Sequence, residues 1–340
     1  HSSQFVFEEW QYAVDQQGLM IWDEYRDVSR VGRGTPLGPA ERERVWGMFA
    51  PVLSEIEEAD SLPWSIVCRK AREAIESGRV ERPFDAVVID EVQDLNVQEV
   101  RFLAALAGEG SDNLMLIGDA GQRIYPGGFS LRSMGIEVRG RSRVLKVNYR
   151  TTREIASAAG HLRDQTVDDL DGESEVGGGI QTLLSGKAPI MRGFNRYEEE
   201  NEFVGERIAE LISEGTRPSE IGVFARLKRL RYWFEEELKR RKIPVCASDR
   251  REDDAKEDGV YMSTMHGAKG MEFRFVFIVG CQQGQVPARA PVGMASDEME
   301  RKAALQREKN LLYVSMTRAR EQLYVTWTGR PSEFLGDPAE

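Results

Sequence analysis

The sequence predicts an α/β chain with two parallel-sheet domains and an N-terminal helical subdomain. Short, continuously apolar runs that end in polar residues recur after position 83, as expected for strands buried in a parallel sheet. Apolar residues at helical spacing fill the intervals between these runs, and the first eighty residues show helical spacing alone. The length of 340 residues also favours two domains, at about 150 residues each.

The residues 1–80 are predicted to form the helical subdomain. Between Pro39 and Ala59, large apolar residues recur at the spacing of one helix face, and a second run of this kind follows Pro63 and ends at Gly78. Proline is favoured in the first turn of a helix, and glycine is favoured just after its end. Both runs therefore read as amphipathic helices whose apolar stripes form a core.

A βαβ unit follows, in a first α/β domain of residues 81–150. Residues 86–89 form a β-branched run that ends in carboxylates, which predicts a strand buried on both faces of a parallel sheet. A helix over 97–107 and a second strand over 114–117 complete the unit. The same sheet is expected to gain a third strand over 144–147.

A second α/β domain is predicted for residues 151–340. It opens with a capping box over 151–154, which starts a helix, and an acidic stretch over 164–175 that reads as a solvated loop. The alternation of strands and helices then resumes. Strands are expected at 190–194, 221–225, 260–264, 275–279 and 323–327, with helices at 198–212, 230–241 and 308–316.

Composition excludes several classes of protein. No apolar stretch approaches the roughly 20 residues that cross a bilayer, so we expect no membrane segment and a cytoplasmic location. The 3 cysteines have no CxxC spacing and there are 3 histidines, which argues against a zinc site. The net charge of −11 argues against a wholly basic surface, but basic residues dominate positions 123–153 and allow one positive face for nucleic acid.

Polar residues follow the predicted strands where ligands gather in open α/β sheets. Asp90 and Glu91 end the first strand, and adjacent carboxylates there can hold Mg²⁺ and orient an attacking water. An acidic turn favoured by the helix dipole explains this motif equally well on its own. Arg150 and Arg318, from different domains, suit a polyphosphate because a guanidinium is planar and permanently charged.

Five segments together resemble a known family. DEVQD at 90–94, GDAGQRIY at 118–125, VNYRTT at 147–152, STMHGAKGMEF at 263–273 and LLYVSMTRAR at 311–320 resemble motifs II to VI of the UvrD/Rep/PcrA-type superfamily 1 DNA helicases. The resemblance implies a RecA-like P-loop NTPase motor that hydrolyses ATP with Mg²⁺ between two domains. It further implies movement 3′→5′ on single-stranded DNA or at a single-strand/double-strand junction, and a helical subdomain like the one inserted in the first domain (1B).

The resemblance also gives each motif residue a role at the nucleotide or on the DNA. For His266, a purely structural histidine remains an alternative. By resemblance, Asp90 coordinates Mg²⁺, Glu91 is the catalytic base, Gln122 senses the γ-phosphate, Tyr149 stacks on adenine, Arg150 and Arg318 contact the γ-phosphate, Glu272 accepts a hydrogen bond from the ribose, and Tyr125, Thr264 and His266 line the single-strand track.

The sequence departs from the family pattern in three places. It contains no G-x-x-x-x-G-K-[ST], the Walker A loop that cradles phosphates, so we expect a missing N-terminal segment and no ATPase from these residues alone. After Tyr125, residues 126–128 are Pro-Gly-Gly, where the family has an aromatic residue and an arginine. Only about 110 residues separate Arg150 from Val260, too few for the large second insertion (2B).

Two functions from different classes therefore stay open. The main interpretation is a motor fragment of an ATP-dependent DNA helicase or translocase, favoured because Asp90, Glu91, Gln122, Arg150 and Arg318 are all present. The alternative is a helicase-like scaffold that binds DNA or a partner without hydrolysing ATP, favoured by the missing phosphate loop. A repair or nuclease partner is compatible with both, and the sequence does not identify one.

Overall fold

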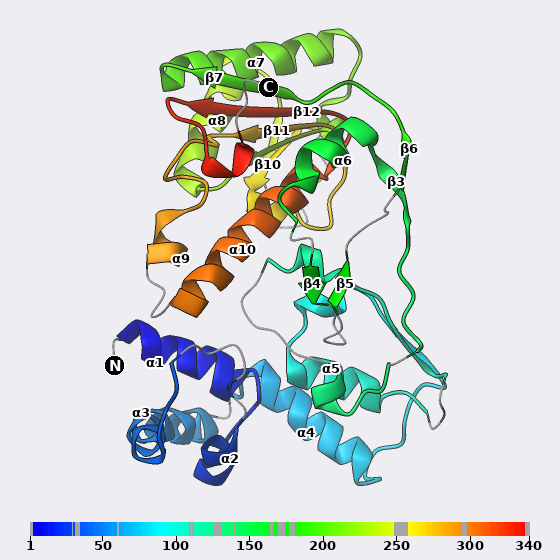
Figure 1. The fold of residues 1–340 in the computed structure, drawn as a ribbon, viewed down its shortest axis with the longest axis vertical. Helices are drawn as coiled ribbons and strands as arrows, with labels where there is room; N and C mark the ends of the chain where they lie inside the picture. The colour runs from blue at the N-terminus through cyan, green and yellow to red at the C-terminus, as the bar shows by residue number, and fades with distance from the viewer. Residues whose placement is uncertain are drawn as a thin grey trace. The chain divides into compact units, whose positions relative to one another are not determined.

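The computed structural model divides into two compact units (Figure 1). The N-terminal unit holds residues 1–142 with 168–175 and 294–304, and the C-terminal unit holds 143–167, 176–293 and 305–340. The structure describes residues 3–28, 30, 35–59, 61–108, 110, 112–124, 131–138, 140–163, 166–168, 174–176, 181–247, 258–293 and 298–336.

The N-terminal unit begins with the predicted helices. The two helices expected from the sequence are confirmed, and Pro39 occupies the first turn of the longer one. Tyr25 is fully buried in a core that the longer helix shares with the segments before it, and it stacks on Trp46 with 5.3 Å between ring centroids. The helices are α1 (Ser3–Glu9), which continues into the π-helical turn η1 (Trp10–Asp15), α2 (Trp22–Asp27), α3 (Pro39–Glu58) and α4 (Trp64–Glu76).

The predicted βαβ unit follows. Strands β1 (Val87–Ile89) and β2 (Leu114–Leu116) are parallel, with Val88 opposite Met115. Helix α5 (Val97–Ala105) connects them. A capping box starts this helix: the Asn96 side chain accepts from the backbone N–H of Glu99 at 2.9 Å, and the Glu99 carboxylate accepts from the N–H of Asn96 at 2.7 Å. Single 3₁₀ turns lie at Val92–Asp94, Ala120–Gln122 and Arg132–Met134.

The expectation that this sheet is buried on both faces is wrong. Ile89 is buried against Val92 and Val100, but Val88 is 63% exposed and Met115 is 57% exposed. In the described part of the chain this sheet has two strands, and only one of its faces carries a buried cluster. An apolar run predicts that its residues can be buried. Burial also requires another element that packs on that face of the sheet.

The expected third strand of that sheet is also wrong. Strand β3 begins at Val147 and extends to Thr152, and it pairs in parallel with β6 (Gln181–Leu184) instead of with β1 or β2. Because the chain stays extended through Thr152, the helix cap moves by one residue. The Thr152 hydroxyl accepts from the N–H of Ile155 at 3.4 Å and starts α6 (Arg153–Gly160).

The predicted capping box over 151–154 does not form. The Glu154 carboxylate accepts from the backbone N–H of Gly186 at 2.8 Å, so it ties the start of α6 to the segment after β6. The expected loop over 164–175 contains two short strands, β4 (Thr166–Asp168) and β5 (Ser174–Val176), which pair with each other. The other residues of that stretch lie outside the described ranges.

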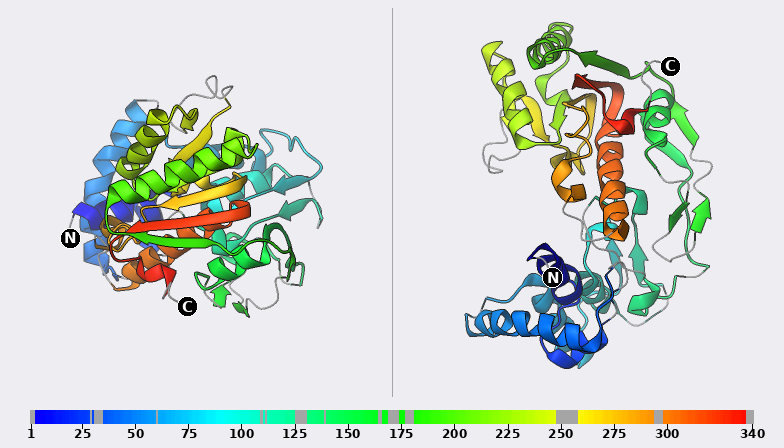
Figure 2. Two further views of the ribbon diagram at one scale, coloured as in Figure 1. Left: turned by 90° about the horizontal axis from the view of Figure 1, so that it is seen from above. Right: turned by 60° about the vertical axis from the view of Figure 1, so that its left-hand side comes forward.

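A six-stranded parallel sheet forms the centre of the C-terminal unit, in the order β7-β12-β11-β8-β10-β9 (Figures 1 and 2). The connections through α7 and α8 run along the sheet in one direction, whereas the connection from β11 through α10 to β12 runs in the other. Right-handed crossovers therefore place α10 on the face opposite α7 and α8. The strands are β7 (Ile190–Phe194), β8 (Ile221–Ala225), β9 (Val245–Ala247), β10 (Val260–Thr264), β11 (Phe273–Val279) and β12 (Ala319–Thr328), and the helices are α7 (Tyr197–Ser213), α8 (Lys228–Arg240), α9 (Arg289–Gly293) and α10 (Glu298–Met316).

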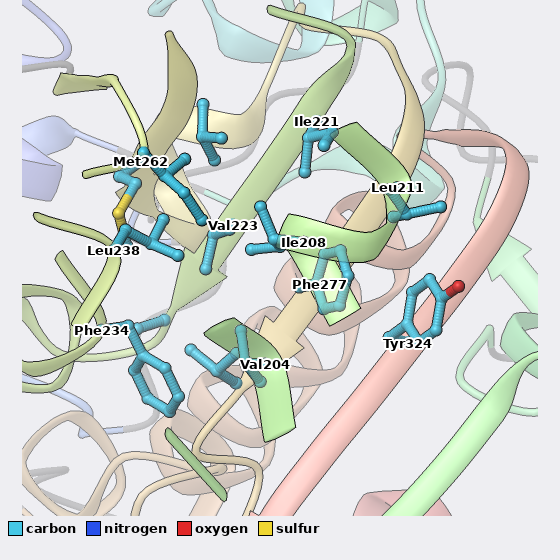
Figure 3. Packing of buried hydrophobic residues seen from close by; sticks show 14 of the residues in the cluster. Val204, Ile208, Leu211, Ile221, Val223, Phe234, Leu238, Met262, Phe277 and Tyr324 are labelled. Carbon is cyan, nitrogen blue, oxygen red and sulfur yellow. The ribbon is translucent and has the colours of Figure 1, made fainter. Parts of the chain in front are cut away.

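The core of this unit lies between the sheet and the two helices α7 and α8. Figure 3 shows Ile208 of α7 and Leu238 of α8 among the side chains of the strands. Phe277 of β11 stacks on Tyr324 of β12, with 4.3 Å between ring centroids. The buried face of the sheet thus fixes the positions of the strand ends, which carry the predicted functional residues.

Three further findings concern the described residues alone. None of their helices combines the length and apolar character needed to cross a membrane. They contain no group of three or more histidine, cysteine, aspartate or glutamate side chains able to hold a metal ion. The three cysteines, Cys68, Cys246 and Cys281, are free thiols.

Candidate functional site

Motif II lies at the carboxyl end of β1. Asp90 and Glu91 are both exposed there, and the Asp90 carboxylate accepts from the backbone N–H of Glu91 at 2.8 Å. Glu91 has a φ of +52°, in the left-handed region that non-glycine residues rarely adopt. Such conformations concentrate at functional sites, because the surrounding structure must impose them. The turn places two adjacent carboxylates at the end of one strand.

Motif III lies at the end of the neighbouring strand β2 and is hydrogen-bonded to motif II. The backbone N–H of Val92 donates to the carbonyl of Ile117 at 3.0 Å. The side chain of Gln93 donates to the Glu91 carboxylate at 2.5 Å and accepts from the backbone N–H of Asp119 at 3.1 Å. The Asp119 carboxylate in turn accepts from the Gln122 side chain at 3.0 Å. The structure therefore brings Glu91 and Gln122 into one hydrogen-bonded group.

In the C-terminal unit, the side chain of Asn148 shapes motif IV. Its carbonyl oxygen accepts from the backbone N–H of Arg150 at 2.8 Å, and its amide donates to the Thr151 hydroxyl at 2.8 Å. The register of β3 with β6 shifts between Asn148 and Thr152, so Tyr149 and Arg150 lie on an irregular part of the strand. Tyr149 is 71% exposed, which leaves its ring accessible to a ligand.

Motifs IV, V and VI meet at residues 271–273. The guanidinium of Arg150 forms an ion pair with the Glu272 carboxylate at 2.5 Å, and both side chains are nearly half exposed. The guanidinium of Arg318 donates to the carbonyl of Met271 at 3.4 Å, and its backbone carbonyl accepts from the N–H of Phe273 at 3.0 Å. Three segments far apart in sequence therefore meet at one short stretch where β11 begins.

The two predicted phosphate-binding arginines have different surroundings. Arg318 is only 3% exposed, and its guanidinium also donates to the carbonyl of Val314 at 2.9 Å, in the last turn of α10. Arg150 is accessible and paired with a carboxylate. The sequence pattern assigns both arginines the same role. It contains no signal that one is buried and the other is accessible.

Thr264 and His266 lie together at the carboxyl end of β10. Thr264 ends the strand, and His266 lies in the 3₁₀ turn Met265–Ala268 that follows. Burial lowers the pKa of His266, and the neighbouring charge of Arg226 lowers this pKa further, whereas Glu308 opposes the shift. His266 is therefore a neutral imidazole at physiological pH.

An ion pair beside this site was not predicted from the sequence. Arg226, the first residue after β8, binds Glu308 of α10 through two guanidinium nitrogens, at 2.9 and 2.6 Å. The Glu308 carboxylate also accepts from the backbone N–H of Ala288 at 2.9 Å. The position of an arginine directly after a buried strand is a signal that could have drawn attention to Arg226.

One predicted residue lies outside the described part of the chain. Tyr125 and the Pro-Gly-Gly at 126–128 both fall in the range 125–130, for which the structure gives no description. The remaining predicted residues fall into three places. Asp90, Glu91 and Gln122 lie at the strand ends of the N-terminal unit, whereas Tyr149, Arg150, Glu272 and Arg318 lie around 271–273 and Thr264 and His266 at the end of β10, all in the C-terminal unit.

Comparison with known proteins places these units in one family. Residues 64–129 match the model of the UvrD/REP helicase N-terminal domain, and residues 143–252 and 246–330 match that of the UvrD-like helicase C-terminal domain. A solved C-terminal domain of a possible DNA helicase from Lactobacillus plantarum is 18% identical, with a TM-score of 0.39 over 56% of this chain and 92% of that chain.

Curated relatives match over shorter stretches. DNA helicase II of Escherichia coli is 38% identical over 98 residues, which is 26% of this chain and 13% of that protein. ATP-dependent DNA helicase PcrA of Staphylococcus aureus is 40% identical over 70 residues, which is 21% of this chain and 9% of that protein. The matched parts thus span a small share of these relatives.

The fold and the family models agree. The parallel sheets with helical crossovers are those of a RecA-like α/β fold, as the sequence predicted. The C-terminal family model alone covers residues 143–330, more than half of the 340 residues. The chain therefore belongs to the UvrD-like helicases, the UvrD/Rep/PcrA type of superfamily 1.

Proposed function

We propose that this chain is part of an ATP-dependent DNA helicase or translocase that moves 3′→5′ on single-stranded DNA. The main support for the proposal is that residues of motifs IV and VI contact residues 271–273 of motif V. It gathers an accessible guanidinium, an accessible carboxylate and an exposed aromatic ring within one unit. Those groups match a triphosphate, a ribose hydroxyl and a base, in that order.

In this proposal the residues of the C-terminal unit bind ATP at its two ends. Tyr149 offers an exposed ring to adenine, and Glu272 accepts a hydrogen bond from the ribose. Arg150 contacts the γ-phosphate, so nucleotide binding exchanges its carboxylate partner for a phosphate. Arg318 donates to the carbonyl of Met271 and so holds the same loop in place. In this proposal its positive charge also contacts the γ-phosphate.

The residues of motif II fit Mg²⁺. This ion is bound in proteins through one or two carboxylates together with phosphate oxygens and waters. Asp90 is exposed and one of its oxygens accepts the N–H of Glu91, which leaves the other oxygen for the ion. When bound, Mg²⁺ supplies positive charge at the phosphates. We propose that Glu91 takes the proton of the attacking water and that Gln122 senses the γ-phosphate.

The DNA-binding part of the proposal rests on the carboxyl end of β10. Thr264 and the neutral His266 would contact a single strand, because a hydroxyl binds phosphate and an imidazole ring can stack on a base. Tyr125 is proposed to extend the same track. Single-stranded DNA, or its junction with a duplex, is the proposed substrate.

A second function is favoured by one observation. The 340 residues contain no G-x-x-x-x-G-K-[ST] loop, whose backbone N–H groups and lysine hold the β- and γ-phosphates. A scaffold that binds DNA without hydrolysing ATP would need no such loop. Under the main proposal, hydrolysis requires that the loop be supplied by a segment outside these residues, in the same chain or in a separate one.

Glu91→Gln tests the proposal, in protein that contains the phosphate loop. DNA-stimulated ATP hydrolysis should slow by about 10²–10⁴-fold, because the base is lost, while ATP binding is retained. Glu81→Gln, which neutralises another exposed carboxylate, should leave hydrolysis unchanged. Hydrolysis by Glu91→Gln within threefold of wild type would contradict the assignment. ATP hydrolysis by the 340 residues alone, abolished by Glu91→Gln, would contradict the need for the loop.

A further inference from the structure

We propose that Gln93 is a positioning residue that fixes the carboxylate of Glu91 and links it to motif III. The inference deepens the proposed function and rests on it, because it concerns the group proposed as the catalytic base. Neither the sequence pattern nor the family comparison assigns a role to Gln93. The proposal stands on a continuous set of hydrogen bonds in the N-terminal unit.

Gln93 is held by two partners of opposite kind. Its side chain is 4% exposed, its amide nitrogen donates to Oε2 of Glu91, and its amide oxygen accepts from the backbone N–H of Asp119. A carboxylate can only accept and a backbone N–H can only donate, so the reversed amide would lose both hydrogen bonds. The surroundings therefore select one orientation of the Gln93 amide.

Asp119 extends the connection to the proposed γ-phosphate sensor. One carboxylate oxygen accepts from the backbone N–H of Gly121 at 2.9 Å, and the other accepts from the Gln122 side chain at 3.0 Å. The order of the connection is thus Glu91, Gln93, Asp119, Gln122. It joins the ends of two neighbouring parallel strands through one buried side chain.

Glu91 has particular need of such support. Its carboxylate is exposed, and its backbone is in the left-handed region. Only Asp90 separates it from the end of β1. An exposed glutamate side chain otherwise samples many rotamers, which lowers the fraction of time in which a base faces its water. Gln93 holds Oε2 and so leaves Oε1 as the oxygen available to the attacking water.

The first experiment compares Gln93→Leu with Gln98→Leu, in protein that contains the phosphate loop. Gln98 is a matched control, since it is also buried and its amide donates to a carbonyl, that of Gln17, outside the connection. Gln93→Leu should lower kcat for ATP hydrolysis by about 10²-fold with KM within twofold, because a small displacement of a catalytic group has that effect. Gln98→Leu should leave both constants near wild type. Equal values for the two variants would overturn the proposal.

Gln93→Glu provides a readout that mere packing would not change. When protonated, the new carboxyl group can donate to Glu91 and accept from Asp119, as the amide does. When ionised, it repels the Glu91 carboxylate, because two adjacent carboxylates disfavour each other's charge. The ratio of kcat in Gln93→Glu to kcat in wild type should therefore fall as the pH rises. A ratio independent of pH would contradict the positioning role.

A third measurement needs no activity and uses the 340-residue chain. Hydrogen exchange at the Asp119 amide should be faster in Gln93→Leu than in wild type or Gln98→Leu, because its acceptor is lost. Unchanged exchange would refute the connection itself. If wild type hydrolyses ATP and Gln93→Leu retains its kcat, the inference fails while the proposed function stands. If wild-type protein that contains the phosphate loop does not hydrolyse ATP, the proposed function fails, and the exchange experiment still decides whether Gln93 connects the motifs.

Discussion

At the residue scale, the Arg150–Glu272 ion pair contributes little to folding. Both side chains are nearly half exposed, so water screens their attraction and the pair contributes about 0–1 kcal/mol to stability. Its proposed value lies in holding both side chains at the loop before β11 until a nucleotide binds. Arg226 and Glu308 form the opposite case, a largely buried pair in which loss of one partner would leave an uncompensated charge.

His266 gives a prediction on pH and stability. Its pKa lies below the ordinary value of 6.5, because of burial and of Arg226, so the unfolded chain takes up a proton at higher pH than the folded one. This contribution to stability is present above about pH 6.5 and is lost as the pH falls towards the folded pKa. We expect the free energy of unfolding to drop between about pH 7.5 and pH 5.5, and His266→Gln to make the drop smaller. Urea denaturation at constant ionic strength measures the free energy of unfolding at each pH. An identical drop in wild type and His266→Gln would contradict the prediction.

At the element scale, one buried carboxylate connects a helix to two strands. Glu200 of α7 is fully buried and accepts from the backbone N–H of Gly280, after β11, at 2.9 Å. It also accepts from the hydroxyls of Thr326 at 2.7 Å and Thr328 at 2.6 Å, both on β12. Burial, together with the charge of Glu200, raises the pKa of the Cys281 thiol, so that thiol stays protonated. The first turn of α7 is therefore fixed to the sheet by polar contacts.

We predict that Glu200→Ala destabilises the chain much more than Glu200→Gln does. The alanine leaves the buried N–H of Gly280, the buried hydroxyl of Thr326 and the partly buried hydroxyl of Thr328 without their acceptor, at a cost of about 3 kcal/mol or more, whereas the glutamine keeps a carbonyl that accepts. Equilibrium unfolding in urea, followed by the fluorescence of tryptophan, gives both values. A loss below about 1 kcal/mol for Glu200→Ala would show that the connection is not needed for stability.

At the scale of the whole molecule, the two units differ in how completely their sheets are built. All six strands of the large sheet lie between Ile190 and Thr328, and the core between the sheet and α7 and α8 comes from the same span (Figure 3). In the N-terminal unit, the described part of the sheet has two strands, with Val88 and Met115 exposed. A two-stranded sheet is marginally stable in water, and exposed apolar residues promote association.

We therefore predict that residues 143–340 fold when produced alone, whereas residues 1–142 produced alone associate. The C-terminal piece should unfold in one cooperative thermal transition and elute from size-exclusion chromatography as a monomer. The N-terminal piece should elute as larger species, and Val88→Thr with Met115→Thr should reduce them. If residues 1–142 are monomeric and fold cooperatively, the exposed face of the two-stranded sheet does not need another element packed on it.

Local patterns in the sequence were enough to predict five of the six strands of the large sheet. The strands at 190–194, 221–225 and 260–264 are confirmed with the predicted bounds, because a short run rich in apolar and β-branched residues is a local property. Strands β6 and β9 were not predicted, since each is short and exists through pairing with a distant partner. The shift of β3 to 147–152 has the same cause.

The sequence by itself determined the fold class, the order of the motifs and thereby the family. Only the tertiary structure decided what those residues contact: that Gln93 lies between Glu91 and Asp119, that Arg318 is buried, and that one face of the small sheet is exposed. The reason is physical. Periodicity and motif spelling depend on neighbours along the chain, whereas the bonds from Gln93 to Asp119 and from Arg226 to Glu308 join residues 26 and 82 positions apart. Such contacts form only when strand pairing and helix packing have closed the intervening chain.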